Sequence, residues 1–176
     1  MKRPFLLLLC VLVLAGCAYA PRGIEGVSSD DRWVALPLRG WLAEDRGRPE
    51  ALIACLSADC PHKLMVALVT LQGDDARAAV AMLREPGRLA ADLQARDARR
   101  ERRRARARVE LRSVGTGAVP GFAVVLAPED GRRAPAHGAA FGRLEGGTLS
   151  LVLAIGDDAG ATLAAAREAA AARLGP

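Results

Sequence analysis

Aromatic residues and histidines are scarce in this chain of 176 residues. Phe, Trp and Tyr together make up 3% of it, and there are two histidines. So few aromatic side chains argue against a platform for single-stranded bases, which combines aromatic faces with positive charge. The sequence also has no G-x-S-x-G, phosphate-binding loop or H-E-x-x-H pattern, and no C-x-x-C. These motifs would supply a nucleophile, a nucleotide site, a catalytic zinc or a redox pair. The sequence therefore predicts no catalytic activity and no cofactor.

The long apolar run at the start is too short to cross a membrane. Phe5 to Ala15 carries no charge and follows Lys2 and Arg3, and Gly16 closes the run. A bilayer core of about 30 Å requires about 20 apolar residues in a helix. A short basic start followed by such a run is typical of a secretory signal peptide.

Two cleavage sites compete at the end of this signal. Ala18-Tyr19-Ala20 matches an A-x-A site, but Pro21 would then follow the cut. Its fixed φ and missing N–H suit an extended bound substrate poorly. Leu14-Ala15-Gly16-Cys17 instead resembles the lipobox of bacterial lipoproteins. The resemblance implies removal of residues 1–16, a diacylglyceryl group on Cys17, and a further fatty acyl chain, such as palmitate, on the new amino terminus. A plainly secreted protein is the alternative.

The lipobox resemblance also implies a location. Two or three acyl chains hold a protein on a membrane essentially irreversibly. Ala18, rather than Asp, follows the anchor. In the Gram-negative sorting pattern that this resembles, such a residue implies the outer membrane, with the protein facing the periplasm. Residues 17–29 lack periodicity and are predicted to be a flexible tether. Residues 30–176 have the length of one domain.

Cys10 is removed with the signal peptide, and Cys17 carries the lipid. Cys55 and Cys60 are then the one remaining pair in an oxidising compartment, where a disulfide is expected. A disulfide requires Cα atoms about 4.4 to 6.8 Å apart, whereas five residues of extended chain span about 16 Å. The chain must therefore turn between them. Apolar runs at 51–55 and 63–71 flank Ser57-Ala58-Asp59, which predicts a β-hairpin.

A metal site is the alternative for the same residues. Cys55, Cys60 and His62 form C-x4-C-x-H, with His137 as a distant fourth ligand. The spacing fits no standard zinc finger, and paired thiols oxidise in this compartment. We therefore predict a disulfide and no metal, with His62 at the start of a strand and His137 in a loop, both on the surface.

The first helix is expected after Asp74-Asp75, and either residue could cap it. Pro86-Gly87 should end it near Glu85. The helical pattern then resumes into a run of arginines: Arg96, Arg99, Arg100, Arg102, Arg103 and Arg104. Mixed charge along a helix usually marks a solvated face, but Arg99, Arg100, Arg102, Arg103 and Arg104 could also bind an anionic surface. Export makes lipid or an acidic protein, rather than nucleic acid, the expected ligand.

The remaining elements are mostly strands. Val34, Leu36 and Leu38 alternate, and Pro37 indicates an edge position. Alternation over 104–114 predicts a half-buried strand. Further strands are expected at 122–126, 139–144 and 148–155, the last two joined by Gly146-Gly147, followed by Asp157-Asp158 and a final helix at 161–174.

This order predicts the α+β class: an antiparallel sheet with a long helix after the first hairpin and a C-terminal helix packed on it. The layout, with Leu36, Pro37 and Trp41 in "LPLRGW", weakly resembles the PsbP/DcrB-like fold. That resemblance implies an accessory or assembly protein. We therefore favour a non-catalytic envelope lipoprotein that binds a protein partner or an anionic surface. The alternative is a small periplasmic enzyme or metal carrier that uses Cys55, Cys60 and His62.

Overall fold

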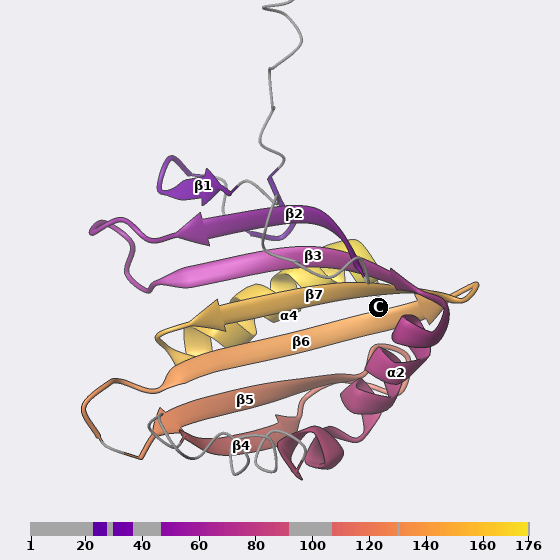
Figure 1. The fold of residues 1–176 in the computed structure, drawn as a ribbon. Helices are drawn as coiled ribbons and strands as arrows, with labels where there is room; N and C mark the ends of the chain where they lie inside the picture. Colours follow the sequence, from indigo (N-terminus) through magenta and orange to yellow (C-terminus); the bar gives the residue numbers. More distant parts are fainter. Residues whose placement is uncertain (1–22, 28–29, 37–46, 92–106, 130, 176) are drawn as a thin grey trace, which may run out of the picture.

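Seven antiparallel strands form one sheet in the order β1-β2-β3-β7-β6-β5-β4 (Figure 1). The structure is a computed structural model that describes residues 23–27, 30–36, 47–91, 107–129 and 131–175. The strands are β1 (Trp33–Ala35), β2 (Gly47–Cys55), β3 (Leu64–Gln72), β4 (Ala107–Ser113), β5 (Gly121–Pro128), β6 (Ala136–Glu145) and β7 (Thr148–Gly156). The main helices are α2 (Gly73–Arg84) and α4 (Ala159–Leu174), and residues 86–91 are also helical. The predicted α+β class is confirmed.

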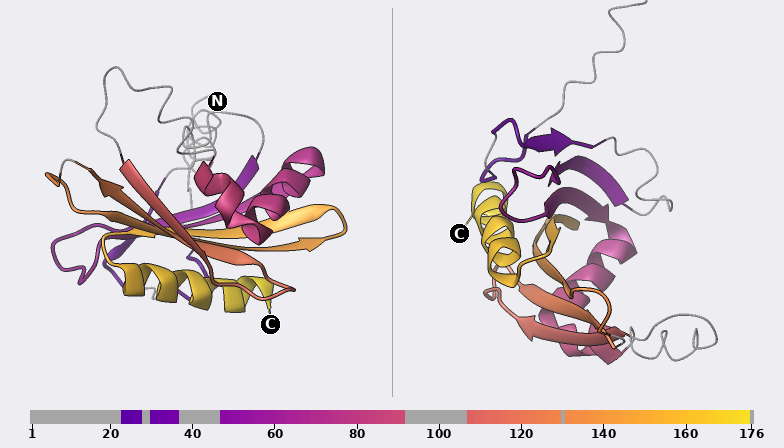
Figure 2. Two further views of the ribbon diagram at one scale, coloured as in Figure 1. Left: turned by 90° about the horizontal axis from the view of Figure 1, so that it is seen from below. Right: turned by 90° about the vertical axis from the view of Figure 1, so that its left-hand side faces the viewer.

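The two main helices pack on opposite faces of the sheet (Figure 2). Successive strand residues point to opposite faces, so each strand supplies two apolar rows. One row packs on α4 through Leu163, Ala166 and Ala169, and we call this side the α4 face. The other packs on α2 through Ala76, Val80 and Leu83, and we call this side the α2 face. The C-terminal helix packs on the sheet as predicted, and the sheet forms the middle of three layers.

The observed hairpins lie where the turn residues of the sequence predicted them. β2 pairs with β3 in register around the predicted turn, and β1 is an edge strand against β2. Gly146 and Gly147 join β6 to β7 with φ of 55° and 80°, a backbone region that glycine enters without steric cost. β4 begins at Ala107 in the described residues, so residues 104–106 of its predicted span lie outside them.

The two helices begin differently. Asp158 caps α4 by accepting a hydrogen bond from Ala161 N at 2.7 Å. Gln72 precedes α2 without a side-chain cap, because β3 runs directly into the helix. The prediction that Asp74 or Asp75 caps α2 is therefore wrong. Both lie inside its first turn, where acidic side chains favour the positive end of the helix dipole.

The domain starts before the predicted boundary at Asp30. Ile24 is 3% exposed and belongs to the core of the α4 face. Gly26 lies so close to Glu168 of α4 that a Cβ there would overlap its carbonyl group. The predicted tether is thus wrong for Ile24 and Gly26. Ile24 and Val27 alone, in a stretch this short, give no sustained periodicity from which burial could be predicted.

Candidate functional site

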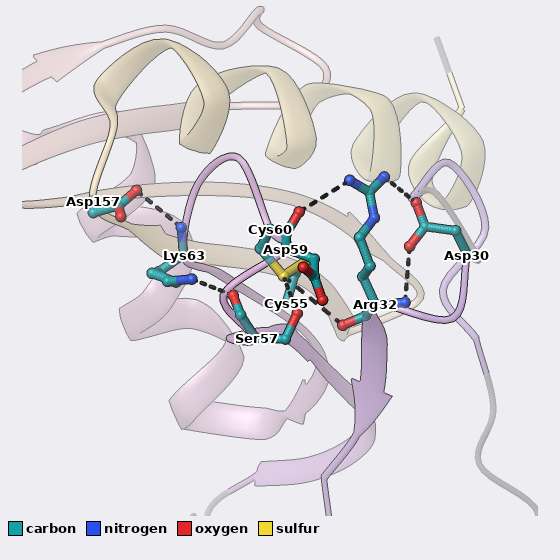
Figure 3. Close-up of a disulfide and its surroundings, with 8 residues drawn as sticks. All are labelled: Asp30, Arg32, Cys55, Ser57, Asp59, Cys60, Lys63 and Asp157. Atoms are coloured by element: carbon teal, nitrogen blue, oxygen red, sulfur yellow. Dashed lines mark hydrogen bonds and ion pairs between the residues drawn. A yellow bond between two sulfur atoms is a disulfide. The ribbon is translucent and has the colours of Figure 1, made fainter.

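The two cysteines form the predicted disulfide at one end of the sheet (Figure 3). Cys55 ends β2, Cys60 follows a tight turn, and their Cα atoms are 5.9 Å apart. Cys60 N donates to Ser57 O at 3.2 Å, which closes the turn. The residues are 3% and 6% exposed. The bridge therefore lies under the surface of the hairpin end, where it fixes the loop and leaves neither sulfur as a thiolate.

Arg32, in the turn before β1, holds one side of the disulfide loop. Its guanidinium donates to Asp30 and, at 3.4 Å, to the carbonyl oxygen of Asp59. The hydrogen bond with Asp30 is the main cause that raises the pKa of Arg32 above its ordinary value. Figure 3 shows the guanidinium between these two groups. Arg32 thus connects the edge strand to the loop.

Asp157, which follows β7, holds the other side of the disulfide loop. Its carboxylate accepts from Lys63 N at 3.0 Å, and its own N–H donates to Lys63 O at 3.2 Å. The ammonium group of Lys63 donates to Ser57 O. The loop is thereby bonded to the centre of the sheet as well as to its edge. This hydrogen-bonded arrangement supports a structural role for the disulfide.

The alternative zinc ligands are not brought together. The side chain of His62 is 44% exposed, and its Nδ1 lies 3.9 Å from Asp157 Oδ1. Within the described residues there is no group of three or more His, Cys, Asp or Glu side chains placed to hold a metal ion. Cys55 and Cys60 would have to be reduced before they could act as zinc ligands.

His137 lies in β6, so its predicted position in a loop is wrong. The strand begins at Ala136 because β6 pairs with β5 from Ala136 and with β7 from His137. Its Nδ1 is buried and has no hydrogen-bond partner within the described chain. His137 borders a polar hollow of about 240 Å³ on the α4 face together with Glu110 and Arg112. Glu110 is paired there with Arg108, Oε1 to Nε, at 2.9 Å.

Sequence reasoning missed an apolar groove on the α2 face. Its cavity measures about 170 Å³. It is lined by apolar residues of five strands: Leu52, Met65, Ala67, Phe122, Val124, Gly138, Ala139, Ala140, Leu153, Ala154 and Ile155. Alternating small residues in "AHGAAFG", between two strands with larger residues, are the signal that could have indicated it.

Several predicted positions lie outside the described residues. These are Cys17, Pro37, Leu38, Trp41 and the arginines Arg96, Arg99, Arg100, Arg102, Arg103 and Arg104. Among the helices that the structure describes, none combines the length and apolar character needed to cross a bilayer.

Comparison with known proteins identifies the N-terminal segment. Residues 1–18 match the family model of the prokaryotic membrane lipoprotein lipid attachment site. The chain therefore carries a bacterial lipoprotein signal, as the lipobox resemblance predicted. No curated protein matches the chain. Together, the match and the domain that follows it indicate a lipid-anchored bacterial membrane lipoprotein.

Proposed function

We propose that this chain is a non-catalytic envelope lipoprotein, anchored through lipid on Cys17, whose domain acts by binding. The match at residues 1–18 is the observation that carries this proposal. Cys17 is the one cysteine in the Leu-Ala-Gly-Cys pattern. Ala18 after it favours the outer membrane, with the domain in the periplasm. A disulfide in the domain fits that oxidising compartment.

The packing of Ile24 keeps the domain near the membrane. Ile24, which belongs to the core of the α4 face, lies seven positions after Cys17. At no more than about 3.6 Å per residue, that stretch reaches at most about 25 Å. A domain held this closely would meet lipid or other membrane-bound proteins before it met soluble partners. Such a position supports a role in binding at the membrane surface.

Intact mass spectrometry of the mature protein from native membranes tests the anchor. We expect a chain that begins at Cys17 and carries a diacylglyceryl group, with or without a third acyl chain. A chain that keeps residues 1–16, or one that begins at Pro21 without fatty acid, would contradict the proposal. Separation of inner and outer membranes tests the location: Ala18→Asp should move the protein toward the inner membrane, and Ala18→Ser should not.

The alternative function is a metal carrier or enzyme centred on Cys55, Cys60 and His62. The disulfide and the position of His62 beside Asp157 favour the structural interpretation. Thiol titration of the native protein separates the two functions. We expect no reactive thiol before reduction and two afterwards. Two free thiols together with bound zinc would favour the alternative.

The arginine-rich stretch remains a proposed binding surface for anionic lipid or an acidic protein. Replacing Arg102, Arg103 and Arg104 by Gln should weaken binding to vesicles that contain phosphatidylglycerol, and more so at low than at high salt, because salt screens exposed charge. Replacing Arg77, Arg132 and Arg133 by Gln removes the same number of charges elsewhere and is the control for total charge. Unchanged binding in the triple variant would mean that the stretch is only a solvated surface. The PsbP/DcrB-like resemblance would agree with an accessory role of this kind.

A further inference from the structure

The polar hollow on the α4 face lies where the sheet extends beyond its helix. α4 packs mainly on β6 and β7, and Figure 1 shows β5 and β4 to one side of it. The strand registers place Glu110, Val125 and His137 in one row across this face, with Arg112 and Ala123 in the next row. Side chains opposite each other on one face of a sheet are neighbours. The hollow therefore runs along β5, with Glu110 and Arg112 on one side and His137 on the other.

The β4 side of this hollow carries both signs of charge. Leu111 alone separates Glu110 from Arg112 in β4, so their Cα atoms lie about 6.6 Å apart at about 3.3 Å per residue. Arg112 makes no ion pair with the described part of the chain. Glu110 is bonded to Arg108 through Oε1, and its second oxygen can accept a further hydrogen bond. This side of the hollow can therefore bind an anionic group and a cationic group of one ligand.

The rest of the hollow is apolar apart from one imidazole. Ala123 and Val125 form its floor, and Ala159, the first residue of α4, borders it. The Nδ1 atom of His137 is buried without a hydrogen-bond partner in the chain that the structure describes, and such a group is costly to leave unpaired. A neutral imidazole offers one donor and one acceptor. These match the C=O and N–H of a single amide group.

The size of the hollow and the spacing of its charges select the ligand. A cavity of about 150 Å³ holds benzene, so the hollow, at about 240 Å³, suits about ten non-hydrogen atoms. A dipeptide of two small residues, such as Ala-Ala, is of this size. Its charged ends lie about 6.6 to 7.2 Å apart when it is extended, which matches the spacing of Glu110 and Arg112. The charges of a free amino acid lie about half as far apart, and those of a tripeptide about half as far again.

We propose that this polar hollow binds a zwitterionic dipeptide of small residues. Its carboxylate pairs with Arg112, its ammonium group pairs with Glu110, and its one peptide group lies beside the ring of His137. The small side chains rest on Ala123 and Val125. The inference goes beyond the proposed anchored binding protein by naming a small ligand, and it does not depend on the lipid anchor.

Isothermal titration calorimetry of the full mature lipoprotein in detergent tests this, with Ala-Ala as the probe. N-acetyl-Ala-Ala lacks the ammonium group, Ala-Ala amide lacks the carboxylate, and alanine and tri-alanine place their charges at other distances. We expect saturable binding of Ala-Ala and at least about tenfold weaker binding of each other compound, because each loses a hydrogen bond to a charged group. No binding of Ala-Ala at millimolar concentration, or equal binding of any other compound, would overturn the proposal. The intact mass of the same preparation reports separately on the anchor.

Two pairs of variants locate the site. Arg112→Gln should weaken the binding of Ala-Ala at least about tenfold, and Arg167→Gln, which removes the same charge from the exposed side of α4, should leave it unchanged. Ala123→Leu fills the floor and should weaken binding at least as much. Ala127→Leu, on the same face of β5 but outside the hollow, should not. Arg112 is exposed, so its substitution leaves the fold intact, and thermal melts check the other variants. Undiminished binding in Arg112→Gln would overturn the proposal.

Discussion

The two faces of the sheet differ in how far a helix covers them. α4 has 16 residues and packs mainly on β6 and β7, and at about 1.5 Å per residue it is about 24 Å long. α2 has 12 residues and about 18 Å of length, and at the end of its face that α2 does not reach, Ile155 is 49% exposed. Alanines at the contact let α4 approach closely: Ala166 and Ala169 are both 0% exposed. Over β6 and β7 the α4 face is thus a closed core, with a polar hollow toward β4, whereas the α2 face combines core with accessible apolar surface.

Removing one large side chain from each face should give the largest difference in the free energy of unfolding. Phe141→Ala, on the α4 face at 5% exposure, should lower the free energy of unfolding by about 3 to 5 kcal/mol. Ile155→Ala, on the α2 face at 49% exposure, should cost less than about 1 kcal/mol. Urea unfolding of both variants measures this. Equal losses would mean that Ile155 is packed in solution, and the contrast between the faces would then be lost.

The disulfide stabilises the end of the sheet at which β2 ends and β3 begins. Replacing Cys55 and Cys60 by Ala should cost about 2 kcal/mol, the loop-entropy value for a closed loop this short. Ser57→Ala, which leaves both sulfur atoms in place, is the control within the same loop. Urea unfolding with and without reductant provides the measurement. Reductant should destabilise the wild type and not the double variant. If the wild type is equally stable when reduced, the hydrogen bonds of Arg32 and Asp157 hold the loop without the bridge.

Local sequence signals predicted the elements but not the helix faces. Alternating residues located the strands, and Gly146-Gly147 and Asp158 marked a turn and a cap, because each of these depends on near neighbours. β7 lies between β3 and β6, an order that only long-range pairing determines. α4 is rich in alanine on all sides, so no periodicity indicates which side is buried. The position of His137 in β6 and the burial of Ile24 likewise depend on partners distant in sequence.

At the candidate site, too, contacts between residues that are distant in sequence could not be predicted. Cys55 and Cys60 could be paired from the sequence because few cysteines remain and the chain turns between them. Arg32 and Asp157 could not be assigned to the disulfide loop, since they reach it from opposite ends of the chain. The groove was missed because its floor and walls come from β5, β6 and β7, and only their register brings Gly138 between Val124 and Ile155.

The start of α4 should respond to acid through its carboxylate cap, which the start of α2 lacks. The pKa of Asp158 is lowered below its ordinary 3.8, chiefly by the hydrogen bond from Ala161 N. A lowered folded pKa stabilises the domain above the ordinary value, and this stability is lost as the pH falls through the folded pKa. Asp158→Asn keeps a cap that does not titrate. Its melting temperature should therefore fall less between pH 5 and pH 2 than that of the wild type. Parallel acid profiles would show that the cap does not contribute to this pH dependence.

The ion pair at the C-terminal end of α4 should have the smallest of these effects on stability. Arg173 Nη2 lies 2.6 Å from Glu50 Oε2, which joins the end of the helix to β2. The pKa of Glu50 is lowered, first by the hydrogen bond from Thr70 and then by Arg173. Both partners are substantially exposed, at 48% and 37%, so the pair should contribute only about 0.2 to 1 kcal/mol. A double-mutant cycle with Arg173→Ala and Glu50→Gln measures the coupling, which should shrink in high salt because exposed pairs are screened. A coupling above about 2 kcal/mol would mean that this contact, rather than the alanine packing, fixes α4 on its face.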